Sequence, residues 1–99
     1  MYLDRYKNEI SKLCLKNKVK TLYVFGSVLT NEFTKKSDID LVVDIDATDP
    51  FDYADNYFNL KFALQDLFQR KIDLLENKAI QNQYFKQSIE QTKMLIYGS

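Results

Sequence analysis

Three aspartates and one Gly-Ser pair are the residues of this sequence best suited to chemistry on a phosphate. Asp38 and Asp40 stand two positions apart at the start of an apolar run, and Asp73 stands between two apolar residues. Carboxylate oxygens bind Mg²⁺, usually together with substrate phosphates. Gly26 and Ser27 end another apolar run, where glycine admits close approach to the backbone and N–H groups suit a phosphate. These residues predict metal-assisted chemistry on a phosphorylated substrate.

Each feature has a plainer interpretation when it is taken alone. A Gly-Ser pair is most often a turn or a helix cap, and an Asp-x-Asp pair most often lies on a solvated strand edge. Asp73 could be ion-paired with Arg70 or Lys71, because a carboxylate among apolar strand residues is costly unless it is paired or metal-bound. The combination at this spacing is more specific, and chance should produce it in about one chain in a thousand of this length.

The pattern of apolar residues predicts the elements that must position these side chains. Helical spacing predicts helices at about 3–14, 52–69 and 80–96, with a short helix at 27–33. Apolar runs rich in β-formers predict strands at 21–25, 38–46 and 71–75. In the second strand, Asp38 and Asp40 would leave the same face while Ile39 enters the core. The order α-β-α-β-α-β-α predicts one α/β domain over 1–99, with helices on a small mixed sheet of three or four strands.

The composition excludes several mechanisms. The 99 residues include no histidine and one cysteine, which removes histidine-dependent catalysis, histidine metal sites and internal disulfides. Cys14 falls on the apolar stripe of the first helix, so we expect a core residue rather than a nucleophile. Seven of the 14 acidic residues, all aspartates, lie between positions 38 and 55, where no basic residue occurs.

The same composition bounds location and partners. No apolar signal core and no run of about 18 apolar residues occurs, so we expect a cytoplasmic protein that does not enter a membrane. The net charge is zero and no contiguous basic run occurs, so we expect no direct binding of nucleic acid.

The spacing Gly-Ser-x10-Asp-x-Asp, with a later aspartate, resembles the signature of the DNA polymerase β-like nucleotidyltransferase superfamily. The stretch LYVFGSVLTNEFTKKSDIDLVVDID is similar to the minimal nucleotidyltransferases (MNT), and the likeness runs through KIDLL to KMLIYG. The resemblance implies the MNT fold and transfer of AMP from ATP. It implies that Asp38, Asp40 and Asp73 are the catalytic residues and hold two Mg²⁺ ions, with Asp73 also a general base. Gly26 and Ser27 would bind the β- and γ-phosphates.

The resemblance also implies a partner. Small members of the family commonly act beside a helical HEPN protein in toxin–antitoxin pairs, transferring AMP to a tyrosine hydroxyl of the toxin. Seven tyrosines and seven phenylalanines exceed what one small core readily hides, which indicates an interface. The candidate surface is the helix with Tyr53, Tyr57, Phe58 and Phe62, for which ordinary core packing on the sheet is an equally good interpretation. A homo-oligomer and a hetero-oligomer both stay open.

One stretch departs from the family pattern. Many relatives read Gly-Ser-x-Ala-Arg-Gly-Glu, but Thr30 stands here at the arginine position and Asn31 at the glycine position. Lys35 and Lys36 could replace the arginine as phosphate-binding residues. The departure keeps two alternatives open: a non-catalytic antitoxin that neutralises its partner by contact, and transfer to a small molecule such as an aminoglycoside.

Overall fold

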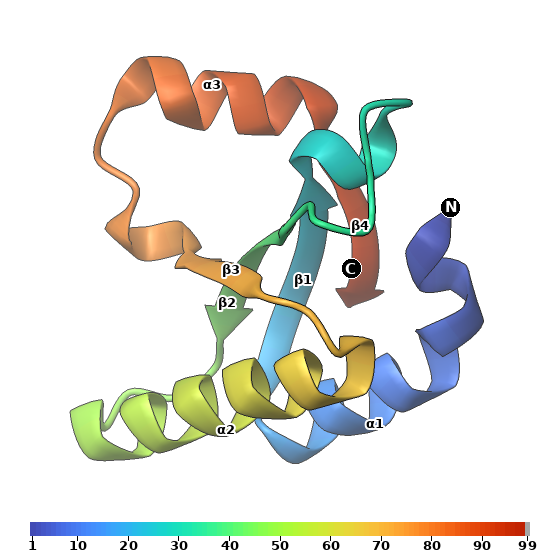
Figure 1. Ribbon diagram of the computed structural model, residues 1–99. Coiled ribbons are helices and arrows are strands. Elements are labelled where there is room, and N and C mark those ends of the chain that lie inside the picture. Colours follow the sequence, from blue (N-terminus) through green and yellow to red (C-terminus); the bar gives the residue numbers. More distant parts are fainter. Residues whose placement is uncertain (99) are drawn as a thin grey trace.

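A four-stranded mixed sheet organises the computed structural model, which describes residues 1–98 (Figure 1). Its strand order is β3-β2-β1-β4, formed by β1 (Val19–Phe25), β2 (Ile39–Ile45), β3 (Ile72–Glu76) and β4 (Met94–Gly98). β1 is antiparallel to both β2 and β4, whereas β2 and β3 are parallel. The parallel pair is joined by a helix, as a parallel crossover requires.

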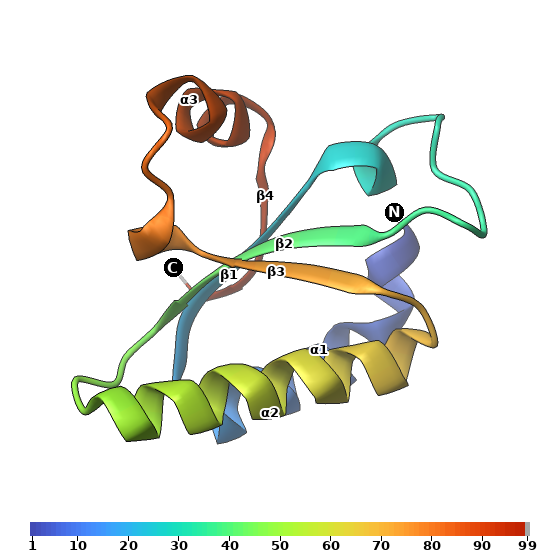
Figure 2. The ribbon, with the colours of Figure 1, turned by 60° about the vertical axis from the view of Figure 1, so that its left-hand side comes forward.

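Helices cover the two faces of the sheet unequally (Figure 2). α1 (Lys7–Lys16) and α2 (Pro50–Phe68) lie together on one face, and α3 (Gln83–Thr92) lies alone on the other. The main core fills the space under α1 and α2, where Ile39, Leu41 and Val43 of β2 are buried. On the α3 face, a second cluster contains only Phe25, Val42 and Ile89 as buried residues. The α3 face is therefore the thinly covered one.

Cys14 confirms the prediction of a core residue. Its side chain is fully buried in the main core, and this burial raises the pKa of the thiol to about 12. Because the thiolate is the reactive form, a thiol with this pKa is chemically inert at neutral pH.

Most predicted elements are confirmed, and three need correction. The predicted helix at 3–14 begins with a 3₁₀ segment, η1 (Tyr2–Tyr6), and only Lys7–Lys16 is α-helical. The predicted helix at 27–33 is only a 3₁₀ turn, η2 (Gly26–Leu29), which Thr30 ends in an extended conformation. The predicted helix at 80–96 ends at Thr92, and Met94–Gly98 forms the edge strand β4. Ile96, expected on a helical face, therefore lies in the sheet. Its alternation with Leu95 and Tyr97 is too short for periodicity alone to separate strand from helix.

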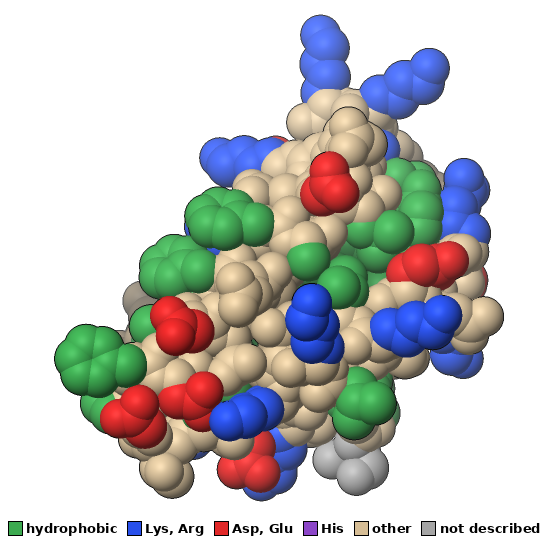
Figure 3. Space-filling view, turned by 90° about the horizontal axis from the view of Figure 1, so that it is seen from below, with side chains coloured by type: hydrophobic (Ala, Val, Ile, Leu, Met, Phe, Trp, Pro, Cys, Tyr) green, Lys and Arg blue, Asp and Glu red, His purple; other side chains and the backbone are tan. Residues whose placement is uncertain are grey.

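The aromatic surface expected on α2 is divided between core and solvent. Tyr53 and Tyr57 pack against the main core, and the Tyr57 hydroxyl donates to the carbonyl of Leu74. Phe58 and Phe62 are 49% and 59% exposed and stack with ring centroids 6.1 Å apart. Seen from the side of α1 and α2, exposed hydrophobic side chains gather along one edge among acidic ones (Figure 3). The role of this surface as an interface stays a prediction.

No helix within residues 1–98 combines the length and the apolar character needed to span a bilayer.

Candidate active site

Asp40 and Asp73 lie side by side in the sheet. They are register partners in the parallel pair of β2 and β3, so their side chains leave the same face. That face is the α3 face, since the preceding partners Ile39 and Ile72 are both buried in the main core. Two aspartates 33 positions apart in the sequence thus meet on adjacent strands, as the family resemblance implied.

The end of β1 brings the Gly-Ser turn against Asp40. Phe25 is the register partner of Asp40 on β1, and Gly26 follows it with φ +79°. A Cβ atom at Gly26 would collide with Oδ2 of Asp40. Glycine is therefore required for two reasons, a left-handed backbone and the close approach of the turn to a carboxylate.

The carboxylates repel one another where they meet. The pKa of Asp40 is raised above its ordinary value, first by partial burial and then by the negative charges of Asp73 and Asp38. Repulsion of this kind is relieved by a cation bound between the acids. The sequence predicted that Asp73 would be buried among apolar residues at a cost in free energy. That prediction is wrong, because Asp73 is exposed. Its solvation explains why it needs no ion pair.

Asp38 stands one residue before β2, and its side chain is partly solvated. Its Oδ2 lies 3.8 Å from Nζ of Lys71, and the two side chains are 44% and 75% exposed. An exposed ion pair at this distance contributes little and is easily displaced. Lys71 is therefore paired with Asp38 rather than with Asp73, and the contact leaves Asp38 accessible.

Arg70 holds the loop that leads into Asp38. Its guanidinium donates to the carbonyl oxygens of Thr34 (3.1 Å) and Ser37 (2.9 Å). It also lies over the rings of Tyr2 and Phe33, 4.8 Å and 4.5 Å from their centroids. Sequence reasoning considered Arg70 only as a partner of Asp73. Its contacts to backbone carbonyls far along the chain leave no signal in the spacing of residues.

The other predicted phosphate contacts lie on the turn and on this loop. Thr30 donates through Oγ1 to the carbonyl of Ser27 (2.8 Å) and accepts from the N–H of Glu32 (3.2 Å). Thr30, the residue at the family's arginine position, thus stabilises the turn by hydrogen bonds to its backbone. Lys35 and Lys36 are exposed on the loop.

The acids are suited to a divalent cation only in combination with a substrate. No three acidic or cysteine side chains within residues 1–98 are close enough together to enclose a metal ion. Mg²⁺, however, is bound through one or two carboxylates together with substrate phosphates and water. Asp40 and Asp73 can supply those carboxylates, and the raised pKa of Asp40 marks a place where added positive charge is favourable.

A cavity of about 690 Å³ opens beside this cluster, over the Gly-Ser turn. One wall comes from the turn and the residues after it, including Gly26, Ser27 and Leu29. The opposite wall comes from α3, through Phe85, Ser88 and Thr92. The sequence analysis missed these α3 residues. Their spacing of three and four positions places them on one helix face, which could have marked them together.

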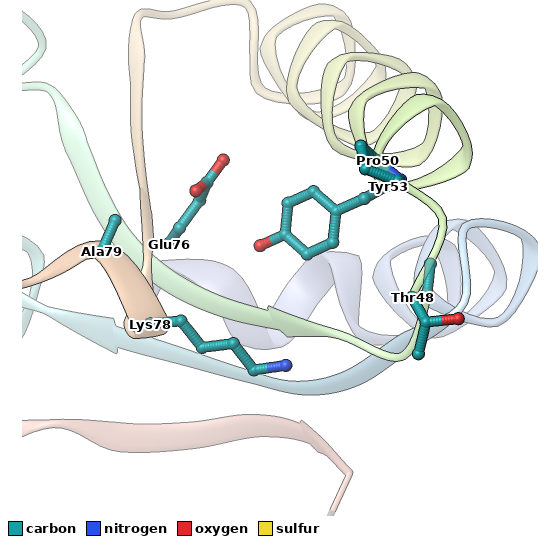
Figure 4. A pocket seen from close by; sticks show the side chains of 7 residues that line it. Thr48, Pro50, Tyr53, Glu76, Lys78 and Ala79 are labelled. Carbon is teal, nitrogen blue, oxygen red and sulfur yellow. The ribbon is translucent and has the colours of Figure 1, made fainter.

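A second hollow, of about 390 Å³, lies at the other end of β2 and β3 (Figure 4). Tyr53 projects into it toward Glu76 and Lys78 (Figure 4). Burial and the charges of Glu76 and Asp44 raise the pKa of the Tyr53 hydroxyl. None of the residues with predicted chemistry lines this hollow, so it is separate from the acidic cluster.

Comparison with known proteins shows which family has this sequence and this fold. The family model described as Polymerase beta, Nucleotidyltransferase matches residues 8–99. A Methanocaldococcus jannaschii protein named "Putative protein adenylyltransferase MJ0128" is 46% identical over 82 residues, covering 83% of this chain and 79% of the relative.

Two solved structures share the fold. The "Structure of putative minimal nucleotidyltransferase" superposes with a TM-score of 0.72 at 23% identity, covering 94% of this chain and 91% of the other. A tri-AMPylated Shewanella oneidensis HEPN toxin in complex with MNT antitoxin matches with a TM-score of 0.63 at 23% identity, covering 94% and 70%. Family model, relative and fold agree: the chain belongs to the polymerase β-type nucleotidyltransferases and has the minimal form of their fold.

Proposed function

We propose that this nucleotidyltransferase moves AMP from ATP to a tyrosine hydroxyl of a HEPN-type partner and thereby acts as an antitoxin. The observation that carries the proposal is the pairing of Asp40 with Asp73 beside the Gly26 turn. The MJ0128 relative supports protein adenylylation, and the AMPylated HEPN toxin bound to an MNT antitoxin supports the partner class.

The proposed roles follow from where each residue lies. Asp38, Asp40 and Asp73 would hold two Mg²⁺ ions, which neutralise phosphate charge and polarise the acceptor hydroxyl. Asp73 is exposed and would take the acceptor proton as a general base. The acceptor oxygen then forms its bond to the α-phosphorus, and pyrophosphate leaves with the electrons of the broken bond.

The turn and the loop would position the triphosphate. Gly26 and Ser27 line the cavity next to Asp40 and would bind the β- and γ-phosphates. Lys35 and Lys36 do not line the cavity. They are exposed on the loop whose end Arg70 holds and would bind a phosphate from that loop. This arrangement would supply the positive charge that Thr30 does not.

The test uses ATP labelled on its α-phosphate, Mg²⁺ and the small helical protein encoded beside this gene. We expect label on a tyrosine of the partner, loss of labelling with a chelator, and loss with Asp38→Ala plus Asp40→Ala. A matched control replaces Asp46 and Asp49, which lie beyond β2 and away from the acidic cluster. Labelling that is unchanged in the Asp38 and Asp40 double variant would refute the assignment.

A contact-only antitoxin is the second candidate. The observation in its favour is Thr30, whose hydroxyl is committed to the turn and leaves the arginine position without a charge. The discriminating measurement is the melting temperature with millimolar ATP and Mg²⁺. A nucleotide-binding enzyme is stabilised under these conditions, whereas a protein that acts by contact alone shows no shift.

A further inference from the structure

The cavity over the Gly-Ser turn has two chemically different walls. The turn side lies against the carboxylate of Asp40 and is bordered by Glu32. The α3 side is uncharged and consists of Phe85 with the hydroxyl-bearing Ser88 and Thr92. Figure 1 shows the C-terminal end of α3 near η2, and residues of both elements line the cavity. A ligand with one charged end and one flat, uncharged end matches these walls.

Phe85 is the aromatic surface of this wall. Its side chain is 44% exposed although its ring meets Phe25 edge to face, with centroids 6.2 Å apart. Phe25 is the register partner of Asp40, so the exposed aromatic ring contacts the residue that pairs with one acid of the cluster. Phe85 also borders a smaller hollow of about 270 Å³ over the end of β3. It thus divides two open spaces, with ring surface available to a ligand.

The size of the cavity is suited to a nucleotide. Small-molecule sites typically measure about 300–1,000 Å³ and combine an apolar wall with a few polar groups, and this one measures about 690 Å³. An aromatic ring offers a triphosphate no hydrogen bond and no positive charge. It does offer a nucleobase a stacking surface, because every base has a π-face.

We propose that Phe85 stacks on the adenine of ATP and that the α3 wall is the nucleobase subsite. This inference rests on the proposed function and adds to it the residue that binds the base. The phosphates then lie toward Gly26 and Ser27, and the base lies toward the N-terminal half of α3. α3 takes on this role although only Ile89 among its ten residues is buried.

The experiment measures binding of two ligands by calorimetry in Mg²⁺: ATP, and inorganic tripolyphosphate, which has no base. Phe85→Ala should raise the Kd of ATP about tenfold, the loss expected when one stacking contact is removed. The Kd of tripolyphosphate should stay unchanged. Phe85→Trp should retain ATP affinity, whereas Phe85→Leu, apolar but not aromatic, should lose it.

Tyr84 supplies the matched control. It precedes Phe85 on the same helix, is 85% exposed and does not line the cavity, so Tyr84→Ala should leave both Kd values unchanged. Melting temperatures of all variants show whether Phe85→Ala keeps the fold. If Phe85→Ala leaves the Kd of ATP within about twofold of the wild type, or weakens both ligands equally, the stacking proposal is wrong. If the wild type binds neither ligand, the proposed function itself fails.

Discussion

Gly26 has little freedom to change. Gly26→Ala would place a Cβ against the carboxylate of Asp40 and force a side chain into a left-handed backbone, φ +79°. Strained backbone of this kind costs about 1–3 kcal/mol, so we expect a loss of stability of that size and a displaced Asp40. Urea unfolding checks the stability, and labelled-AMP transfer checks the site. An alanine variant with wild-type stability and activity would show that the turn does not bear on Asp40.

Asp40 should make the fold less stable as pH rises. Its pKa in the folded protein is raised, so between its unfolded and folded pKa values the folded state binds more protons and stability falls with increasing pH. The penalty is absent below the ordinary aspartate pKa and complete above the raised one. Asp40→Asn should therefore melt higher than the wild type at pH 7, and the difference should vanish as the solution is acidified.

Mg²⁺ with a nucleotide provides the control for that measurement. A cation at the acidic cluster removes the repulsion, so we expect the wild type to be stabilised and Asp40→Asn to gain little. The melting temperature of Asp40→Asn could instead exceed that of the wild type by the same amount at pH 7 and well below the ordinary aspartate pKa. That result would mean that the charge of Asp40 is not the cause of the difference.

At the scale of elements, Arg70 determines the position of the loop before β2. Arg70→Ala removes two hydrogen bonds to backbone carbonyls and the contacts with Tyr2 and Phe33. We expect a loss of about 1–3 kcal/mol, since the carbonyls lose a charged donor, and faster hydrogen exchange at residues 34–38. Arg5→Ala is the matched control, because Arg5 also lies over the Tyr2 ring, 5.1 Å from its centroid, without touching the loop. Equal exchange in both variants would contradict the role given to Arg70.

α3 is attached to the sheet through one buried side chain. Ile89 packs with Phe25 and Val42 and is 3% exposed. Ile89→Ala should cost about 2–5 kcal/mol if helix and sheet unfold together, but we expect α3 to open locally while the sheet keeps its protection. Hydrogen exchange resolves the two cases, with Gln87→Ala on the exposed side as control. Equal loss of protection in α3 and in β2 would show that α3 is not an independent unit.

The elements show how far sequence reasoning reaches. Strand periodicity suffices to put Asp38 and Asp40 on one face of a single strand. That Asp73 follows on a neighbouring strand was implied by the family resemblance, because strand order cannot be read from local periodicity. β4 could not be predicted, because Met94–Gly98 is short and directly continues the apolar pattern of α3. Arg70 and Phe85 were missed since their roles depend on contacts with residues distant in the chain, which local patterns do not record.

In the whole molecule, the main hydrophobic core and the candidate active site lie on opposite faces of the sheet. The main core lies under α1 and α2, whereas the acids, the Gly-Ser turn and the cavity lie on or beside the thinly covered α3 face. This division lets the site carry mutually repelling charges without weakening the main core. It is also consistent with a sequence of 99 residues that lacks histidine, since the proposed reaction requires positioned carboxylates and a bound phosphate.

The most direct test compares single substitutions within the sheet. Labelled-AMP transfer in Mg²⁺ is measured for Asp40→Asn, Asp73→Asn and Asp44→Asn. Asp44 is the matched control, because it lies four positions after Asp40 on the same strand, β2. Its carboxylate lies 3.7 Å from Nζ of Lys78 rather than beside Asp73. Loss of a proposed metal ligand should remove several kcal/mol of transition-state stabilisation, so we predict a fall of roughly 100-fold or more for Asp40→Asn and Asp73→Asn. Asp44→Asn should stay near wild type, and an Asp73→Asn variant as active as the wild type would contradict the account.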